Sequence, residues 1–412
     1  MAEAAGAGAA PSAEGERLPR EVKGLGAVSL FNDFASEMVY PVLPALITGP
    51  LGGGALALGA LDGAADLTAS AVRVASGRLA DRSGWTRPLI AVGYALALLV
   101  RPLIAVASAA WQVIAFRMLD RLGKGLRSPA RDALLSRVTP VPLRGRAFGL
   151  HRGADHLGAV LGSLTAWLML SAGSDPRSVI AASLVPAVAA IVVLAVVLRW
   201  LGRHGERSTV NGKRGTVMDS PSPINRQPSP FPVARSPFTG PLAVLVLLSA
   251  GRIPEALLLL RLQEAGVAVA MIPLAWAGLH VVRSVASYPG GVLADRAGVR
   301  SSLALGSLVY AGILVLFAVV AGAEGAVAVF LAYGVGAGLV EPAERLAVTR
   351  LAPVRTGRAF GIYQGLAGAA ALPAGLLFGW MYETQGQAVA LVASAVALGV
   401  GAVVWWTVNG ER

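Results

Sequence analysis

Charged side chains occur at helical spacing inside long apolar segments of this sequence, and they are the residues that could do chemistry. Between residues 25 and 48, Asp33, Glu37 and Tyr40 fall on one face of a helix. A charge at the centre of a bilayer costs ~2.5 kcal/mol or more unless it is paired or hydrated. Buried carboxylates of this kind can carry protons, so we expect Asp33 or Glu37 to take up and release one.

The segment 111–131 carries the most charge. Its charged residues lie within about 120° of one another on a helix, and they are Arg117, Asp120, Arg121, Lys124, Arg127 and Arg131. In segment 55–78, Asp62, Asp66 and Arg73 share a narrow arc. Such basic side chains can bind an anionic or polar solute, or tune a nearby carboxylate. For each single residue the alternative is a buried ion pair that only fixes helix packing.

A possible metal site lies in segment 146–171. His151 and Asp155 are one helical turn apart, as are Arg152 and His156. Imidazole and carboxylate ligands at this spacing suit a transition metal, but His151 and His156 diverge by about 140° on a helix. We therefore assign no metal ligands.

The candidate site residues form two sets. We expect proton coupling from Asp33, Glu37, Asp66, Arg117 and Asp155. We expect solute binding from Tyr40, Asp62, Arg73, Asp120, Arg121, Lys124, His151, Arg152, Arg252, Glu255, His280 and Glu341.

The elements that must position these side chains are membrane helices. Of 412 residues, 55% are hydrophobic and only 14% are charged. About 20 apolar residues span a bilayer as a helix, and twelve segments of about that length follow one another, at 25–48, 55–78, 87–108, 111–131, 146–171, 177–199, 240–262, 267–292, 301–321, 326–348, 358–380 and 387–407. We expect an all-α membrane protein, because a soluble core could not bury so much apolar surface.

Basic residues alternate between the connecting segments. They occur near 78–87, 137–146, 199–214, 296–300 and 350–358, whereas no Lys or Arg occurs at 49–54, 109–110, 172–176, 263–266, 322–325 or 381–386. Basic loops stay on the cytoplasmic side of a membrane. We therefore expect both termini in the cytoplasm and the chain in a bacterial cytoplasmic (inner) membrane. This placement accounts for the net charge of +12 without a nucleic-acid partner.

Residues 201–238 differ from their surroundings, being polar and rich in proline. They are typical of a flexible linker. The expected organisation is a cytoplasmic tail (1–24), a six-helix bundle (25–200), a cytoplasmic linker (201–238), a second six-helix bundle (239–408) and a short C-terminus (409–412). We expect no signal peptide, since residues 1–24 lack an apolar core. The chain has no cysteine, which excludes disulfides, thiolate metal sites and cysteine catalysis.

Three motifs recur in the same order, about 213 residues apart. The pattern G-x-L-A-D-R-x-G occurs at 77–84 and 291–298, and G-R-A-F-G occurs at 145–149 and 357–361. Between them, Gly123 to Pro129 matches Gly336 to Pro342. Six spans in each half give the two repeats the same orientation, with a pseudo-two-fold axis along the membrane normal.

The pattern G-x-L-A-D-R-x-G between the second and third spans resembles motif A of the major facilitator superfamily, here present in both halves. The resemblance covers nearly the whole chain apart from residues 1–24 and 201–238. It implies two six-helix bundles that rock around a central site, exposing it to each side in turn. It also implies a gating latch in motif A, formed by Gly77, Asp81, Arg82, Gly84, Gly291, Asp295, Arg296 and Gly298. The alternative for motif A is a fixed structural turn.

Two other motifs resemble the family in part. The stretch 117–125 is similar to motif B, whose Arg is linked to proton coupling; Arg117 takes that position, and Arg121 stands where Gly is usual. The stretch 158–163 is similar to the antiporter motif C, but Ala159 replaces its Pro and Ser163 replaces its last Gly. These departures weaken, without removing, the implied drug–proton antiport.

We therefore expect a secondary active transporter that exports a small polar, anionic or amphipathic solute, coupled to protons. We expect it to act as a monomer among membrane lipids, without a cofactor. Symport uptake, facilitated diffusion and transition-metal export remain alternatives. An enzyme or receptor is disfavoured, because the sequence contains no H-E-x-x-H, nucleophile elbow or Walker loop.

Overall fold

A computed structural model describes residues 18–80, 84–139, 144–210, 239–351 and 356–408. Most of the chain in these ranges is helical, with short connections between helices, and the ranges contain no strand. The expected all-α class is confirmed.

The helices of the first half match its six expected spans. They are α1 (Arg20–Val39), η2 (Tyr40–Val42), α2 (Leu43–Thr48), α3 (Ala55–Ala80), α4 (Thr86–Ala105), α5 (Ala110–Val138), α6 (Arg144–Ser171), α7 (Pro176–Ala182) and α8 (Leu184–Val210). The first span consists of α1, η2 and α2, and the sixth of α7 and α8. The structure corrects two boundaries: α1 begins within the expected tail, and α8 continues into the expected linker.

The second half repeats this order. Its helices are α9 (Thr239–Ala250), α10 (Glu255–Glu264), η4 (Val269–Met271), α11 (Ile272–Arg296), α12 (Gly298–Val319), α13 (Ala323–Leu351), α14 (Thr356–Gln385) and α15 (Gln387–Val408). The repeat extends to backbone detail. Gly84 and Gly298, the last residues of the two G-x-L-A-D-R-x-G motifs, have φ of 85° and 81°, a left-handed conformation that favours glycine.

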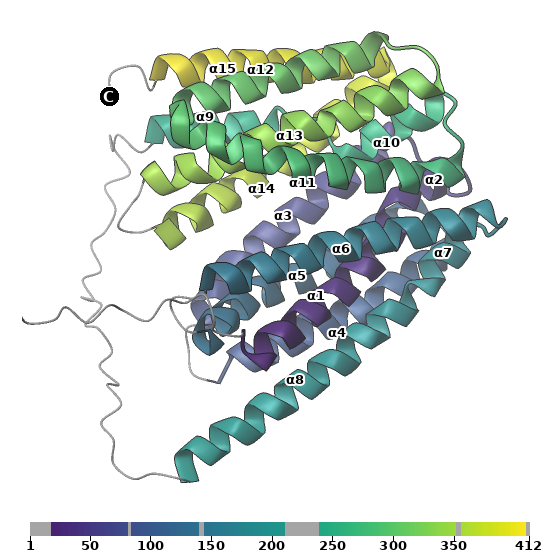
Figure 1. Ribbon diagram of the computed structural model, residues 1–412. Coiled ribbons are helices and arrows are strands. Elements are labelled where there is room, and N and C mark those ends of the chain that lie inside the picture. The colour runs from purple at the N-terminus through teal and green to yellow at the C-terminus, as the bar shows by residue number, and fades with distance from the viewer. Residues whose placement is uncertain (1–17, 81–83, 140–143, 211–238, 352–355, 409–412) are drawn as a thin grey trace, which may run out of the picture.

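The two halves form two helical bundles, which diverge at one end and meet at the other (Figure 1). We call the diverging end, where α1 begins, α8 ends and α9 begins, the tail side. The opposite end, where α2 ends and α3 begins, is the far side. The most extensive contact between the halves joins α3 to α14. Glycines allow this approach: a Cβ on Gly59 would collide with the backbone of Gly375, and a Cβ on Gly375 with that of Gly59.

The surface of the bundles suits a bilayer. Nine spans in the described residues are long and apolar enough to cross a membrane. The spans built on α1, α5 and α6 do not meet that criterion, and these are the helices in which charge is concentrated. Large apolar side chains such as Leu99, Val185 and Val285 are 67–74% exposed, an exposure that lipid tails tolerate and water does not. The protein is a multi-pass membrane protein.

The seventh span is interrupted, which the sequence analysis did not anticipate. The expected continuous helix at 240–262 ends at Ala250, and α10 begins at Glu255 after Pro254. Proline cannot donate the backbone hydrogen bond that would continue α9. The first half is perturbed at the matching place, where the η2 turn contains Pro41. Interrupted helices in corresponding positions are typical of transporter binding sites.

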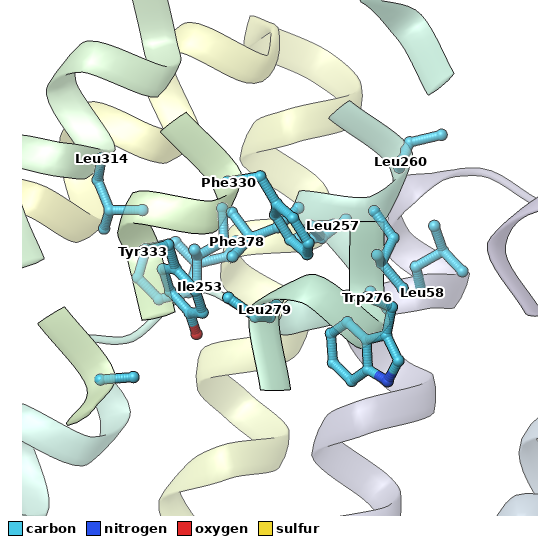
Figure 2. Close-up of a cluster of buried hydrophobic side chains, with 14 of the residues drawn as sticks. Leu58, Ile253, Leu257, Leu260, Trp276, Leu279, Leu314, Phe330, Tyr333 and Phe378 are labelled. Atoms are coloured by element: carbon cyan, nitrogen blue, oxygen red, sulfur yellow. The ribbon is translucent and has the colours of Figure 1, made fainter. Parts of the chain in front are cut away.

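Apolar packing closes the far side. Figure 2 shows Leu58 of α3 beside Leu257 and Leu260 of α10, with Trp276 of α11 next to them. These four residues are at most 8% exposed and belong to one buried cluster that spans both halves. The cluster separates the middle of the molecule from the far side.

Candidate functional site

A cavity of about 480 Å³ lies between the two bundles. Charged residues from both halves line it, and they are Glu37, Asp62, Asp66, Arg73, Arg121, Arg252, Glu255 and His280. Its aromatic walls come from Tyr40, Trp276, Tyr310, Tyr333 and Tyr363. Eight of the charged candidates thus share one space with five large rings, an arrangement that suits a polar or amphipathic solute.

Asp62 joins the two halves at the interruption of the seventh span. Its Oδ2 accepts a hydrogen bond from the Tyr40 hydroxyl at 2.8 Å and another from the backbone N–H of Ala256 at 3.1 Å. Ala256 lies in the first turn of α10. The unpaired N–H groups of a helix N-terminus attract anions. A carboxylate of the first half therefore caps a helix of the second.

Glu37 makes a second contact between the halves. Its Oε2 accepts a hydrogen bond from Trp276 Nε1 at 2.8 Å and lies 3.8 Å from His280 Nε2. The rings of Trp276 and His280 meet edge to face, 5.0 Å apart. A positively charged His280 would form an ion pair with Glu37 at this distance, so the two residues can form a charged contact between the halves.

Ion pairs within the second half fix the other side of the cavity. Arg283 pairs with Glu255, which also accepts a hydrogen bond from the Tyr333 hydroxyl at 3.2 Å. Arg252 pairs with Glu344, whose side chain is 8% exposed. Arg283 and Glu344 were not among the candidates from sequence.

A buried network in the first half contains two of the candidates, Arg117 and Asp120. Asp120 Oδ1 accepts from Arg101 Nε at 3.0 Å, and Asp120 Oδ2 lies 3.5 Å from Arg117 Nη1. Arg101 and Arg127 both donate to the side-chain oxygen of Asn32, at 3.1 and 3.3 Å. The members of this network are at most 5% exposed.

This network corrects two expectations for α5. Asp120 faces Arg101 of α4 and the Arg117 guanidinium lies over the Tyr40 ring; neither residue lines the cavity, whereas Arg121 does. Helical geometry accounts for Asp120, which points about 100° away from Arg121. Arg117 shares a helix face with Arg121, but it packs against the Tyr40 ring, which itself lines the cavity. Lys124 and Asp33 are likewise absent from the cavity wall; the Asp33 carboxylate accepts a hydrogen bond from Asn32 at 2.9 Å. Arg101 was missed as a partner, although the sequence shows it as the only charge in the interior of its span, where Arg87 lies at the edge.

His151 and Asp155 form a separate cluster between α6 and α1. The Ser29 hydroxyl donates to Asp155, and His151 Nε2 lies 3.4 Å from Ser29 Oγ and 3.8 Å from Asp155 Oδ1. The expected place of His151 in the solute site is not supported, because it lies outside the cavity wall. Asp155, which we expected to serve proton coupling, also lies outside it. The described residues contain no group of three or more metal-ligand side chains.

A second cavity, of about 350 Å³, brings together Arg152 and Glu341 with Glu344, Arg345, Tyr363 and Gln364. Arg152 of the first half and Glu341 of the second half therefore line one space, outside the main cavity. Tyr363 and Gln364 line both cavities. Arg73 Nη1 donates to Gln364 Oε1 at 3.1 Å, a further contact between the halves.

The gating motif is described in part. Asp81 and Arg82 lie outside the described residues, and nothing is described for the side chain of Asp295. Gly77 and Gly291 lie near the tail-side ends of α3 and α11, and Arg296 is exposed as the last residue of α11. The latch therefore stays a prediction.

Comparison with known proteins agrees with this architecture. The family model described as Major Facilitator Superfamily matches residues 25–260. An uncharacterised protein of Mycobacterium tuberculosis is 30% identical over 386 residues, which cover 92% of this chain and 90% of that protein. An uncharacterised MFS-type transporter of Methanocaldococcus jannaschii is 27% identical over 92% of this chain and 93% of its own.

Another relative matches a shorter part of this chain. The multidrug resistance protein MdtH of Photorhabdus laumondii is 33% identical over 133 residues, 32% of this chain and 33% of that protein.

Solved structures share the fold at low identity. A POT family transporter in complex with 5-aminolevulinic acid has a TM-score of 0.73 at 11% identity, covering 95% of this chain and 96% of its own. The nucleoside transporter NupG has a TM-score of 0.74 at 11% identity, covering 95% and 100%. The family model matches more than half of the chain, and the structure has two repeated bundles with a charged cavity between them. This chain belongs to the major facilitator superfamily of membrane transporters.

Proposed function

We propose that the protein exports a small polar, anionic or amphipathic solute across the bacterial cytoplasmic membrane in exchange for protons. The observation that carries the proposal is the cavity between the bundles, where unpaired and paired charges face aromatic walls at the depth of the interrupted helices. A transporter must hold a polar solute away from lipid, and charges that are expensive in a bilayer mark such a pathway. The partial similarity to MdtH supports export.

The orientation belongs to the same proposal. The basic segments of the chain adjoin the tail side, where Arg78, Arg87, Arg137 and Arg296 lie. The positive-inside rule favours the tail side as cytoplasmic, and the cavity would then be shielded from the outside by the apolar cluster around Leu58. In this orientation the structure corresponds to an inward-facing state.

Solute binding is tested by thermal stabilisation of the purified protein against a library of metabolites, drugs and metal salts. Arg121→Gln removes a charge from the cavity wall, and Lys124→Gln removes one from the same helix outside the wall. We expect a ligand that stabilises the wild type to bind about tenfold more weakly to Arg121→Gln, a loss typical of one charged hydrogen bond. Equal stabilisation of wild type and Arg121→Gln, or a selective loss in Lys124→Gln, would contradict this assignment of the site.

Proton coupling is tested with the same ligand in proteoliposomes. We expect Glu37→Gln to bind the ligand but to lose its response to an imposed pH gradient, because glutamine keeps the acceptor for Trp276 and cannot ionise. A gradient response that persists in Glu37→Gln would remove Glu37 from the coupling pathway. Symport uptake predicts solute movement in the same direction as protons, and facilitated diffusion predicts none against a solute gradient.

A further inference from the structure

The carboxylate of Asp62 reaches from the first half to the N-terminus of α10 in the second half. The two hydrogen bonds that its Oδ2 accepts, from Tyr40 and from Ala256, come from obligatory donors. An ionised carboxylate accepts both and also interacts favourably with the helix dipole, whereas a protonated one loses the charge that the dipole attracts.

A second observation is the buried positive charge of Arg117 near Asp62. The guanidinium of Arg117 lies over the ring of Tyr40 at 5.0 Å, and Arg117 is 1% exposed. Its Nε and Nη2 have no hydrogen-bond partner. A buried cation beside the ring whose hydroxyl binds Asp62 favours a negative charge on Asp62 in this conformation.

The contact also holds the far side closed. Asp62 is on α3, about two turns from the far-side end of that helix. The chain between α9 and α10 is non-helical at residues 251–254, so α10 can move relative to α9. Moving α10 and its buried leucines away from α3 would open the apolar cluster around Leu58, and it would break the hydrogen bond from Ala256 to Asp62.

We propose that Asp62 is a proton-operated latch: ionised, it caps α10 and holds the far side closed, and protonated, it releases α10 so that the far side opens. The inference rests on the proposed proton-coupled exchange and assigns Asp62 to coupling rather than to solute binding. Conformation and protonation are reciprocally linked. Asp62 thus binds a proton in the far-side-open state. It releases this proton into the tail-side cavity when the contact with α10 forms again. In the proposed orientation this cycle moves protons inward.

Other charged or titratable groups face the same carboxylate, and the experiment must distinguish their pH responses from that of Asp62. They are Glu37 on α1, Tyr40 on η2, Asp66 on α3, Arg117 and Arg121 on α5, Glu255 on α10 and His280 on α11. The residues of α14 that pack against this part of α3, Ala371, Leu372 and Gly375, carry no charge. Asp132 is the control, since its half-exposed carboxylate pairs with Arg131 on α5 and does not line the cavity.

The chain has no cysteine, so spin labels can be attached at introduced cysteines only. Val106→Cys and Val319→Cys place labels at the far-side ends of α4 and α12, where both positions are more than 70% exposed. Trp85→Cys and Ala297→Cys report on the tail side. Double electron–electron resonance in nanodiscs then gives both distances between pH 5 and pH 9 without any solute.

We expect acid pH to increase the far-side-open population of the wild type by about three- to tenfold, the range of a helix-terminus charge interaction. Asp62→Asn should lose this pH response, because its amide still accepts from Ala256 but does not titrate. Asp62→Leu, without any cap, should favour the open form at every pH. Asp132→Asn should respond to pH as the wild type does.

A pH response that persists in Asp62→Asn, or that disappears in Asp132→Asn, would overturn the assignment to Asp62. A far side that stays closed in Asp62→Leu would overturn the latch itself. The flux assay and the spin-label distances separate the two proposals. If a pH gradient drives flux but the far-side distance does not respond to pH, the latch is rejected and the proposed function stands. If the far-side distance responds to pH as expected but a pH gradient drives no flux, the proposed function is rejected and the latch stands.

Discussion

At the scale of single residues, the membrane charges have two different uses. Glu37, Asp62, Asp66 and Arg121 face the cavity, whereas Arg101, Arg117, Asp120 and Arg127 form a buried network away from it. Burying an ion pair is expensive, and breaking one leaves an uncompensated charge. We infer that the first group serves transport and that the second fixes the packing of α1, α4 and α5.

The buried network makes a prediction about stability. Asp120→Asn should destabilise the protein by about 3–5 kcal/mol, because it leaves Arg101 and Arg117 without their carboxylate. Asp132→Asn is the control: its carboxylate pairs with Arg131 at 3.0 Å, but its side chain is 49% exposed, and exposed pairs contribute only about 0–1 kcal/mol. Thermal unfolding in detergent compares the two, and equal losses would mean that the network is not a structural unit.

At the scale of elements, small residues decide how closely helices approach. Gly158 and Gly162, in the stretch that resembles motif C, lie against the backbone of Leu30 and Phe34 in α1. The missing proline of that motif therefore does not prevent α6 from packing closely on α1. Gly59 and Gly375 play the same role between α3 and α14, across the two halves.

The contact between α3 and α14 can be tested with one methyl group. Gly375→Ala places a Cβ against the backbone of Gly59, and we expect a loss of about 1–3 kcal/mol in stability, as for overpacking in a core. Gly365→Ala, on the same helix, meets open space and should be neutral or slightly stabilising. If both variants melt at the wild-type temperature, the halves do not depend on this close approach.

The N-terminus of α7 gives a prediction about pH. Asp175 caps it, accepting from the backbone N–H groups of Arg177 and Ser178 at 2.7 and 3.0 Å, and these hydrogen bonds hold the pKa of the Asp175 carboxyl below its usual range. A lowered pKa in the folded state means that the stabilisation is present above the unfolded pKa of about 3.9 and fades as pH falls through the folded value.

Asp175→Ala should therefore lower the melting temperature slightly at pH 7 and have less effect as the pH approaches 3. Asp175→Asn should retain much of the cap at all pH values, since asparagine is also a good N-cap. A larger effect of Asp175→Ala at acid pH than at pH 7 would contradict this account.

At the scale of the whole molecule, most of the architecture could be predicted from the sequence, but fewer of the contacts in the candidate site could be. Apolar length and the recurring motifs predicted twelve spans in two repeats, because both depend on local composition and order. The break before α10 was missed, because a proline does not always interrupt a span: Pro342 lies inside a helix that stays continuous. Contacts such as Asp62 with Ala256 depend on how the bundles meet, which no spacing along one helix reveals.

The second half shows the same limit. Arg283 and Glu344 carry no pattern that separates them from other charges in their spans, yet they form the ion pairs beside the cavity. Their partners Glu255 and Arg252 were predicted, but as solute ligands rather than as members of pairs. Charge in a span predicts burial against protein, and only the packed structure says against which residue.

The central claim is that protons drive a solute through the cavity between the two bundles. Its most direct test is flux into and out of proteoliposomes with an imposed pH gradient, using a ligand found by thermal stabilisation. We predict that the solute accumulates on the acidic side against its own gradient, and that collapsing the pH difference abolishes this accumulation. Equal rates with and without the gradient, or accumulation on the alkaline side, would contradict proton-coupled export.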